Sequence, residues 1–277
     1  MSIIVIDRQV VHYEVIGRGQ PVLFLHGWMG SWRYWFPTME RVADHFRTYS
    51  FDFWGFGDSQ RQNTIESINT YSNQVIRFLD ALGIDRVMLV GHSMGGMVAL
   101  RTALNHPRRI TRVAAVGAPI VGSSLSPLLK ITDIPAVARS FVKMPKFRRF
   151  MFRHFLGVQD DPALAEILDD STKSSSTTLQ RAVSSMLRTD LRPELPKLSV
   201  PALIVHGGRD EIVHPNQADL FDDVTAAEVV VMPESRHFPF LDEAELFNDM
   251  LLRFLKQELQ RPMMPRVQTP KPAALSS

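Results

Sequence analysis

The stretch VMLVGHSMGGMVALRT, residues Val87–Thr102, places Ser93 just after a short apolar run. The residues before this serine are typical of a buried strand, and those from about Met94 onward are typical of a helix that ends near Asn105. A strand, a sharp turn and a helix in this order are a building unit of sheets covered by helices. The stretch therefore predicts an α/β fold with Ser93 on the turn.

Ser93 has two interpretations on such a turn. In a G-x-S-x-G turn, Gly91 and Gly95 are the small neighbours that strained backbone geometry requires, and the serine hydroxyl lies at the carboxyl edge of the sheet as a nucleophile. The backbone N–H of Met94 then points at an oxygen bound beside the serine. Alternatively, Ser93 only caps the helix, because serine is a common N-cap residue. The choice depends on whether the chain also supplies a base, an acid and a second donor.

Segments typical of strands and helices alternate on both sides of this turn. The expected strands lie in the hairpin Ile3–Ile16 and at Pro21–Gly27, Arg47–Gly55, Ile110–Gly117, Val200–Gly207 and Ala227–Pro233. The expected helices lie within Trp32–Phe46, before Gly83, and around Phe247, Met250, Leu251, Phe254 and Leu255. This alternation predicts a mostly parallel sheet with helices on both faces, and ligands are expected at the carboxyl ends of the strands.

The alternation stops between residues 119 and 198. This interval has helical segments, three X-Pro breaks, the polar run STKSSSTT and no convincing strand. We therefore expect a core formed by residues 1–118 and 199–260, with residues 119–198 as a helical cap insertion over the strand ends. The Pro-rich tail, residues 261–277, has no apolar period and is expected to be disordered.

The composition is that of a soluble globular protein. Of the 277 residues, 45% are apolar and 22% are charged, and the formal charge of only +2 does not point to a nucleic-acid partner. The absence of cysteine excludes a disulfide framework, a thiolate metal site and a cysteine nucleophile. The start MSIIVID does not resemble a signal peptide, and no apolar run is long enough to span a membrane, so we expect a cytoplasmic protein.

A serine nucleophile needs a base that titrates near neutral pH, and histidine is the natural choice. His26 and His92 lie near the turn, but the geometry of their own turns limits their reach. His237, in MPESRHFPF, lies on the loop after the last expected strand, from which its ring can reach Ser93. We therefore predict His237 as the base, with a solvated loop histidine as the alternative.

An acid must hold the base in the correct tautomer and stabilise its charged form. In VHGGRDEIV, Asp210 follows the preceding strand on a Gly-Gly turn that directs its carboxylate inward. Glu211 is the rival, but successive side chains on a tight turn point apart, and aspartate is the shorter and stiffer residue. We therefore predict Asp210 as the acid, with a surface carboxylate as the alternative.

The second oxyanion donor is expected in the loop after an early strand. In LHGWMGSW, His26 and Gly27 form the turn, and the N–H of Trp28 is the candidate that faces the N–H of Met94. An ordinary strand-to-helix turn is the alternative. If the prediction is correct, two backbone N–H groups hold the oxyanion.

These motifs together resemble the α/β-hydrolase superfamily, in particular its serine esterases and lipases with a helical cap. The likeness extends from about Gln20 to Leu259 through GQPVLFLHGW, FDFWGFGDS, VGHSMGG, VHGGRDEIV and ESRHFPFLDE, in that order. One departure is Trp54, where the family often has Arg or Pro, so no role is carried over to its side chain. The resemblance implies no metal or organic cofactor. A serine at position 93 argues against the dehalogenase and epoxide hydrolase branches, which have aspartate there.

The cap insertion is expected to determine the substrate. Between residues 139 and 156 it interleaves basic and large apolar side chains: Arg139, Lys143, Lys146, Arg148, Arg149 and Arg153 with Phe141, Phe147, Phe150, Met151, Phe152 and Phe155. We interpret this stretch as a cap helix with an apolar underside facing an acyl pocket. Contact with an anionic membrane surface is the less favoured alternative. Both interpretations favour a small apolar ester or an acyl lipid as the partner.

The motifs predict a serine hydrolase that cleaves a carboxylic ester through an acyl-enzyme on Ser93. The nearest alternatives are other branches of the superfamily: carbon–carbon bond hydrolases, perhydrolases, amidases and acyltransferases. A ligand receptor built on this fold is an alternative from a different class. A scaffold with a decayed site is disfavoured, because every expected catalytic position is filled.

Overall fold

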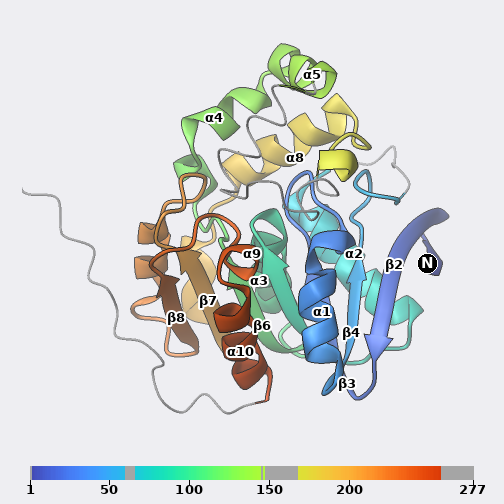
Figure 1. The fold of residues 1–277 in the computed structure, drawn as a ribbon, viewed down its shortest axis with the longest axis vertical. Coiled ribbons are helices and arrows are strands. Elements are labelled where there is room, and N and C mark those ends of the chain that lie inside the picture. Colours follow the sequence, from blue (N-terminus) through green and yellow to red (C-terminus); the bar gives the residue numbers. More distant parts are fainter. Residues whose placement is uncertain (1, 60–65, 145, 147–167, 257–277) are drawn as a thin grey trace, which may run out of the picture.

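Eight strands form one sheet in the order β1-β2-β4-β3-β5-β6-β7-β8 (Figure 1). The computed structural model describes residues 2–59, 66–144, 146 and 168–256. Neighbouring strands run parallel from β4 to β8, whereas β1 and β2 add an antiparallel edge. The strands are β1 (Ser2–Ile6), β2 (Gln9–Gly17), β3 (Gln20–Leu25), β4 (Phe46–Phe51), β5 (Val87–His92), β6 (Ile110–Val116), β7 (Ala202–Gly207) and β8 (Ala227–Met232). The predicted mostly parallel sheet is confirmed.

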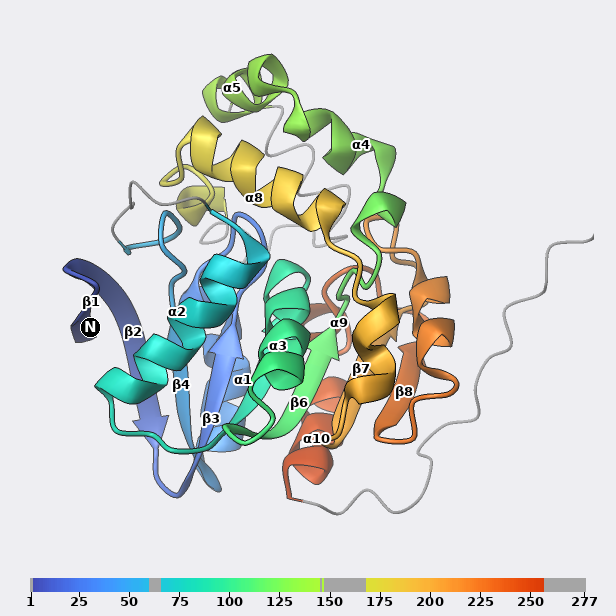
Figure 2. The ribbon, with the colours of Figure 1, turned by 180° about the vertical axis from the view of Figure 1, so that it is seen from behind.

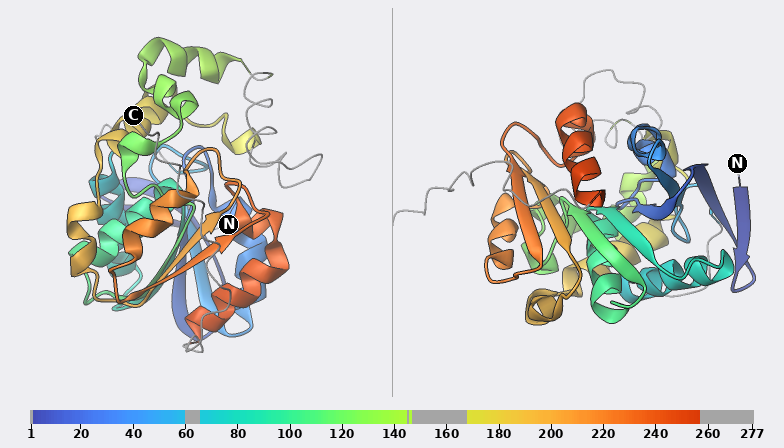
Figure 3. Two further views of the ribbon diagram at one scale, coloured as in Figure 1. Left: turned by 90° about the vertical axis from the view of Figure 1, so that its left-hand side faces the viewer. Right: turned by 90° about the horizontal axis from the view of Figure 1, so that it is seen from below.

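Helices cover both faces of this sheet. The α-helices are α1 (Phe36–Ala43), α2 (Ile68–Ala81), α3 (Met94–Asn105), α4 (Pro127–Lys130), α5 (Pro135–Lys143), α8 (Ser176–Arg188), α9 (Pro239–Asp242) and α10 (Ala244–Leu255). Short 3-10 helices are η1 (Trp32–Trp35), η2 (Gly122–Ser124), η3 (Ile131–Asp133), η4 (Arg192–Lys197) and η5 (Pro215–Phe221). The sheet separates α1 and α10 from α2 and α3 (Figure 3), and α2 and α3 lie in front of it when the molecule is seen from behind (Figure 2).

The side chains of the central strands alternate between two apolar clusters, one on each face of the sheet. In β5, Leu89 packs into the cluster under α2 and α3, whereas Met88 and Val90 pack into the cluster under α1 and α10. Every residue of β5 is buried, as the near-continuous apolar run predicts. The predicted apolar stripe of the last helix is also buried, at Phe247, Met250, Leu251, Phe254 and Leu255.

The segment predicted as helical within Trp32–Phe46 is divided into shorter elements. Ser31 caps η1 by accepting the N–H of Arg33 (3.2 Å), and α1 then begins with a proline in its first turn, where no N–H is needed. The helix ends at Ala43, because Phe46 already pairs with Gln20 as the first residue of β4. Pairing of Phe46 with β3 therefore ends the helix earlier than the helical pattern of the sequence predicts.

The described part of the 119–198 interval lies above the carboxyl ends of the strands. Figure 1 shows α4, α5 and α8 stacked over this edge of the sheet. Within the described part of this interval the one extended pairing is an isolated bridge between Val121 and Asp190. Residues 145 and 147–167, which hold most of the predicted basic and aromatic cap helix, lie outside the described residues, as does the tail 261–277. The division into core, cap and tail therefore stays a prediction.

None of the helices in the described ranges combines the length and the apolar character needed to span a membrane.

Candidate active site

Ser93 lies in strained backbone geometry between β5 and α3. Its φ is +52°, in the left-handed region that non-glycine residues avoid, and its backbone N–H donates to the carbonyl of Val116 on β6 (2.8 Å). The side chain of Ser93 makes no capping hydrogen bond with the first turn of α3. The interpretation of Ser93 as a mere N-cap is therefore wrong, because its hydroxyl does not serve the helix.

Two glycines permit this turn. A Cβ atom on Gly91 would overlap the carbonyl oxygen of Gly95, and a Cβ atom on Gly95 would overlap the carbonyl oxygens of Leu25 and His26. Both positions therefore need glycine, and the second also brings the start of α3 against the loop that follows β3. The turn at Ser93 and that loop are thus packed backbone to backbone.

Asp210 and His237 form a buried pair on the loops after β7 and β8. His237 Nδ1 lies 2.8 Å from Asp210 Oδ2, while Asp210 Oδ1 accepts the backbone N–H groups of Ile212 (2.8 Å) and Val213 (2.9 Å). A carboxylate only accepts, so Nδ1 of the neutral ring carries the proton and Nε2 has its lone pair available. The pair therefore presents an imidazole in the tautomer that a general base needs.

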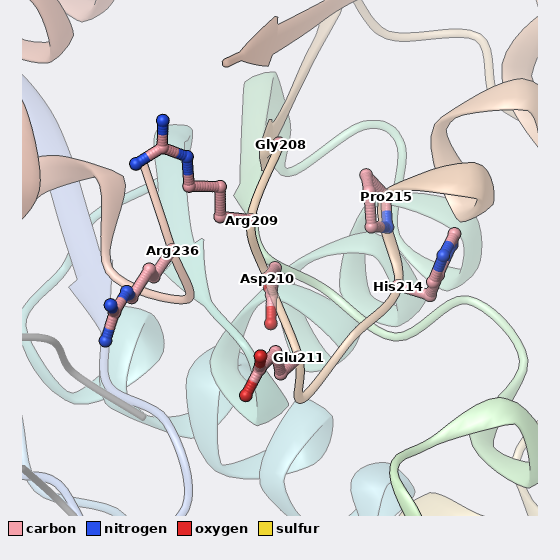
Figure 4. A pocket seen from close by; sticks show the side chains of 7 residues that line it. All are labelled: Gly208, Arg209, Asp210, Glu211, His214, Pro215 and Arg236. Atoms are coloured by element: carbon pink, nitrogen blue, oxygen red, sulfur yellow. The ribbon is translucent and has the colours of Figure 1, made fainter. Parts of the chain in front are cut away.

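Glu211, the rival acid, is exposed to solvent. Both acids help to line a surface pocket of about 630 Å³, together with His214 and Arg236 (Figure 4). Asp210, by contrast, is only 3% exposed. The structure therefore joins Asp210, and not its neighbour, to His237.

His237 is also tied to the residue that precedes Ser93. Its backbone carbonyl oxygen lies 2.8 Å from His92 Nε2, and the two imidazole rings are 4.8 Å apart. The ring of His237 also lies against the turn after β6, where a Cβ atom on Gly117 would be 3.3 Å from Nδ1. Ser93 and His237 are both buried, at 7% and 5% exposure. The strand ends thus bring Ser93, Asp210 and His237 into one buried region.

The loop after β3 packs directly on Ser93. A Cβ atom on Gly27 would lie 3.2 Å from the Cβ atom of Ser93. Next to it, Trp28 extends toward the cap, and its indole Nε1–H donates to the carbonyl of Leu179 on α8 (3.0 Å). The loop that carries the predicted oxyanion donor therefore contacts both the turn at Ser93 and α8.

His26 orients the peptide group between Gly27 and Trp28. Its Nε2 accepts the N–H of Phe53 (3.0 Å), so in the neutral ring Nδ1 carries the proton and donates to the carbonyl of Gly27 (2.8 Å). Burial lowers the pKa of His26 to about 4, which keeps the ring neutral near pH 7. Because a trans peptide group is planar, fixing this carbonyl also fixes the N–H of Trp28, which points the opposite way.

Met94 is the first residue of α3. Its backbone N–H therefore has no partner within the helix, and it lies at the positive end of the helix dipole. Two candidate donors, on Trp28 and Met94, thus come from the two segments that pack against each other at Ser93.

A buried carboxylate that the sequence reasoning missed supports the same loop. Asp52, at the end of β4, accepts the N–H groups of Trp32 and Asp58 (2.8 Å each). Burial raises the pKa of its carboxyl to about 7. The segment FDFWGFGDS contains this residue, and a carboxylate next to a strand end is the signal that could have identified it. Asp52 holds the turn that contains Gly55 and Gly57 against the loop after β3.

A second carboxylate joins this loop to the cap. Asp170, only 2% exposed, accepts the hydroxyl of Ser31 and pairs with Arg33 (2.8 Å) and Lys173 (2.7 Å). The same two cations also reach Asp58 (2.7 and 2.8 Å). This network of alternating charges fastens the described end of the cap to the loop after β3.

Buried histidines make the fold sensitive to acid, and His206 offers a test. Burial lowers the pKa of His206 from 6.5 to about 4, and neither ring nitrogen has a hydrogen-bond partner in the described part of the chain. Between these two pH values only the unfolded state binds the proton, so stability falls as the pH falls. We expect the wild type to lose about 3 kcal/mol through His206 across this window.

His206→Leu should remove that loss, which urea unfolding at a series of pH values measures. At pH 8 the histidine is neutral in both states, so this pH gives the packing baseline for the comparison. The contribution of Asp52 to stability has the opposite pH dependence, but Asp52 is present in both proteins, so its contribution cancels in the comparison. If the free energy of unfolding had the same pH dependence in the two proteins, His206 could not be the source of the loss.

The described residues contain no group of three or more His, Asp or Glu side chains placed to hold a metal ion.

Known proteins are similar to this chain in sequence or in fold. A pimeloyl-acyl-carrier-protein methyl ester esterase from Vibrio cholerae is 27% identical over 253 residues, which cover 88% of this chain and 97% of that protein. The solved structure of an esterase from Exiguobacterium antarcticum is 26% identical and covers 92% of this chain and 99% of its own, with a TM-score of 0.80. An enol-lactonase from Burkholderia xenovorans, at 22% identity, shares the fold with a TM-score of 0.81 over 92% of this chain and all of its own. The profile of the alpha/beta hydrolase family matches residues 22–250, so this chain belongs to that family.

Proposed function

We propose that the protein is a serine hydrolase that cleaves carboxylic esters through an acyl-enzyme on Ser93. The observation that carries the proposal is the position of His237. Its ring Nδ1 lies 2.8 Å from Asp210 Oδ2, and its backbone carbonyl accepts a hydrogen bond from His92, the residue before Ser93. The strained Ser93, whose hydroxyl has no capping role, is the nucleophile.

The reaction proceeds in two halves. Ser93 Oγ attacks the ester carbonyl carbon while His237 Nε2 takes the hydroxyl proton, and the N–H groups of Trp28 and Met94 stabilise the oxyanion. The intermediate collapses, and His237 returns the proton to the leaving alcohol. Water, deprotonated by His237, then attacks the acyl-enzyme, and the acid leaves as Ser93 regains its proton. Asp210 keeps the proton of His237 on Nδ1 and stabilises the charged ring in both halves.

The relatives favour an ester substrate. The Vibrio cholerae and Exiguobacterium antarcticum proteins are named esterases, and both are more than 25% identical to this chain. The predicted apolar underside of the cap suits a small apolar ester or an acyl lipid, and we propose these as the substrate class.

A panel of substrates tests the proposal. Nitrophenyl esters with acyl groups from acetate to palmitate are compared with the matching nitroanilides and with a vinylogous diketone. We expect turnover of the esters, with an optimum at one acyl length, and much slower turnover of the other two classes. Ester turnover no faster than that of a Ser93→Ala control would contradict the proposal. Preferred cleavage of the diketone would favour a carbon–carbon bond hydrolase instead.

A further inference from the structure

The His92 side chain lies at the centre of a buried hydrogen-bond chain that joins three loops. His92 Nε2 is 2.8 Å from the carbonyl oxygen of His237, and His92 Nδ1 is 3.2 Å from the hydroxyl of Tyr34. The same hydroxyl accepts the backbone N–H of Gly27. The chain therefore runs from the oxyanion loop through η1 and β5 to the loop that carries the base.

The direction of every hydrogen bond in this chain follows from the chemistry of its groups. A carbonyl oxygen only accepts, so His92 Nε2 carries a proton and donates to His237. The neutral ring then has an acceptor at Nδ1, so the hydroxyl of Tyr34 must donate to it. The oxygen of Tyr34 keeps lone pairs for the N–H of Gly27. Each donor has one acceptor, and reversing any one bond would leave two donors or two acceptors facing each other.

The surroundings bury this series of hydrogen bonds away from solvent and favour its neutral groups. Phe238 packs on the ring of His92 (4.4 Å between centroids), and Phe240 packs on Tyr34 (5.4 Å). Phe238 also packs edge-on against the ring of His237 (5.3 Å between centroids). His92 and Tyr34 are both buried, and burial holds the pKa of His92 well below its usual value. A hydrogen bond in such surroundings is costly to break, because no water replaces the lost partner.

We infer that Tyr34 and His92 are positioning residues that set the oxyanion loop and the base loop relative to Ser93. The hydroxyl of Tyr34 fixes the peptide N–H of Gly27, whose Cα lies against Ser93, and His92 fixes the backbone of His237. Among the described residues, neither side chain forms a hydrogen bond with the hydroxyl of Ser93 or with the ring of His237. Both act by holding Trp28 and His237 where the transition state needs them, and a misplacement of such groups lowers the rate of chemistry more than it weakens substrate binding.

Tyr34→Phe tests this inference, because it removes one oxygen and leaves two buried groups without a partner. We expect kcat to fall about 10- to 100-fold with little change in KM. The inhibition constant of a trifluoromethyl ketone, which forms a tetrahedral adduct with a serine, should rise by the same factor as kcat/KM falls. A loss confined to KM, or a kcat equal to that of the wild type, would overturn the inference.

Tyr71→Phe is the matched control. Tyr71 is fully buried in α2 and donates to the carbonyl of Trp54 at 3.4 Å, outside the hydrogen-bond chain. Both variants lose one buried hydroxyl and are assayed well below their melting temperatures. We expect only Tyr34→Phe to lose kcat and affinity for the ketone. Equal losses in the two variants would mean that the effect is one of general stability, which would also overturn the inference.

Two replacements of His92 test its hydrogen bonds to Tyr34 and to His237 separately. His92→Asn keeps an acceptor near the position of Nδ1 for Tyr34, whereas His92→Gln keeps a donor near the position of Nε2 for His237. We expect each to retain more kcat than His92→Leu, which keeps neither. A His92→Leu variant with the kcat of the wild type would contradict the role of His92.

The kinetic measurements rest on the proposed ester hydrolysis, so a spectroscopic measurement tests the hydrogen-bond chain by itself. Long-range proton–nitrogen spectra of the histidine rings should show His92 as the Nε2–H tautomer, without titration around the usual histidine pKa of about 6.5. An Nδ1–H tautomer of His92 would refute the proposed hydrogen bonds to His237 and Tyr34, whatever the enzyme hydrolyses. A wild type that turns over no ester but shows the expected tautomer would instead refute the proposed function alone.

Discussion

Replacing Ser93 by alanine is expected to lower kcat by roughly four to six orders of magnitude, with KM almost unchanged. The change removes the oxygen that attacks the carbonyl but leaves the binding surface and the backbone donors in place. The residual rate should come from the oxyanion donors and from binding alone. A steady-state assay with the best ester of the panel measures the loss.

The folded structure should survive this substitution. The hydroxyl of Ser93 makes no capping hydrogen bond, and alanine is no more strained than serine at φ +52°, so the melting temperature should stay close to that of the wild type. Ser72→Ala is the matched control, because Ser72 is buried in α2 and its hydroxyl accepts a hydrogen bond from Thr102 (2.9 Å). Ser72→Ala should keep kcat. A Ser93→Ala protein with more than a trace of activity would exclude Ser93 as the nucleophile.

Asp210→Asn is expected to lower kcat by roughly ten-thousand-fold through the tautomer of His237. The N–H groups of Ile212 and Val213 both need an acceptor, so the amide oxygen of the new side chain must face them. Its NH2 group then faces His237 Nδ1, which becomes an acceptor, and the ring proton moves to Nε2. A ring with a proton on Nε2 cannot take the proton of Ser93.

Glu211→Gln provides the comparison for this prediction, because it makes the same chemical change one residue later. Glu211 is exposed, and the acid–base pair does not include it, so kcat should not change. Thermal unfolding of both variants checks that the loop remains folded. The assignment of the acid would be wrong if Glu211→Gln lost more activity than Asp210→Asn.

The sheet and its helices could be predicted from local patterns, because central strands such as β5 and β7 bury both of their faces and the last helix buries one. The run Val87–Val90 and the stripe on α10 are apolar for that reason, and the structure buries both. The end of the Trp32–Phe46 segment was predicted less well. Its helical pattern extends into Phe46, which pairs with β3, and a pairing partner is not visible in a local pattern.

The two loop side chains of the candidate acid–base pair could be predicted because each follows a strand in chain order. Asp210 was preferred to Glu211 from the geometry of a tight turn and from its shorter, stiffer side chain, and the structure pairs Asp210 with His237. The N-cap interpretation of Ser93 was left open by the sequence, since serine suits both roles. The φ of +52° and the missing capping bond decide against it.

The supporting residues could not be predicted, because their partners are far away in the sequence. His92 was expected to have limited reach, and its ring does stay in place, but it bonds to His237, 145 residues later. Tyr34 contacts it from another segment, and Asp170 pairs with Arg33 from the cap. Each of these contacts depends on how loops from different strands meet, and the sequence of a single chain does not specify that locally.

The most direct test of the account is the site of covalent labelling by a fluorophosphonate, located by mass spectrometry of the digested protein. A reactive phosphonate needs a nucleophilic serine, a base and oxyanion donors together, but not the natural substrate. The account predicts one adduct, on Ser93, that is absent in Ser93→Ala and forms far more slowly in Asp210→Asn. An unlabelled wild type, an adduct on another residue, or equal labelling of Ser93→Ala would contradict it.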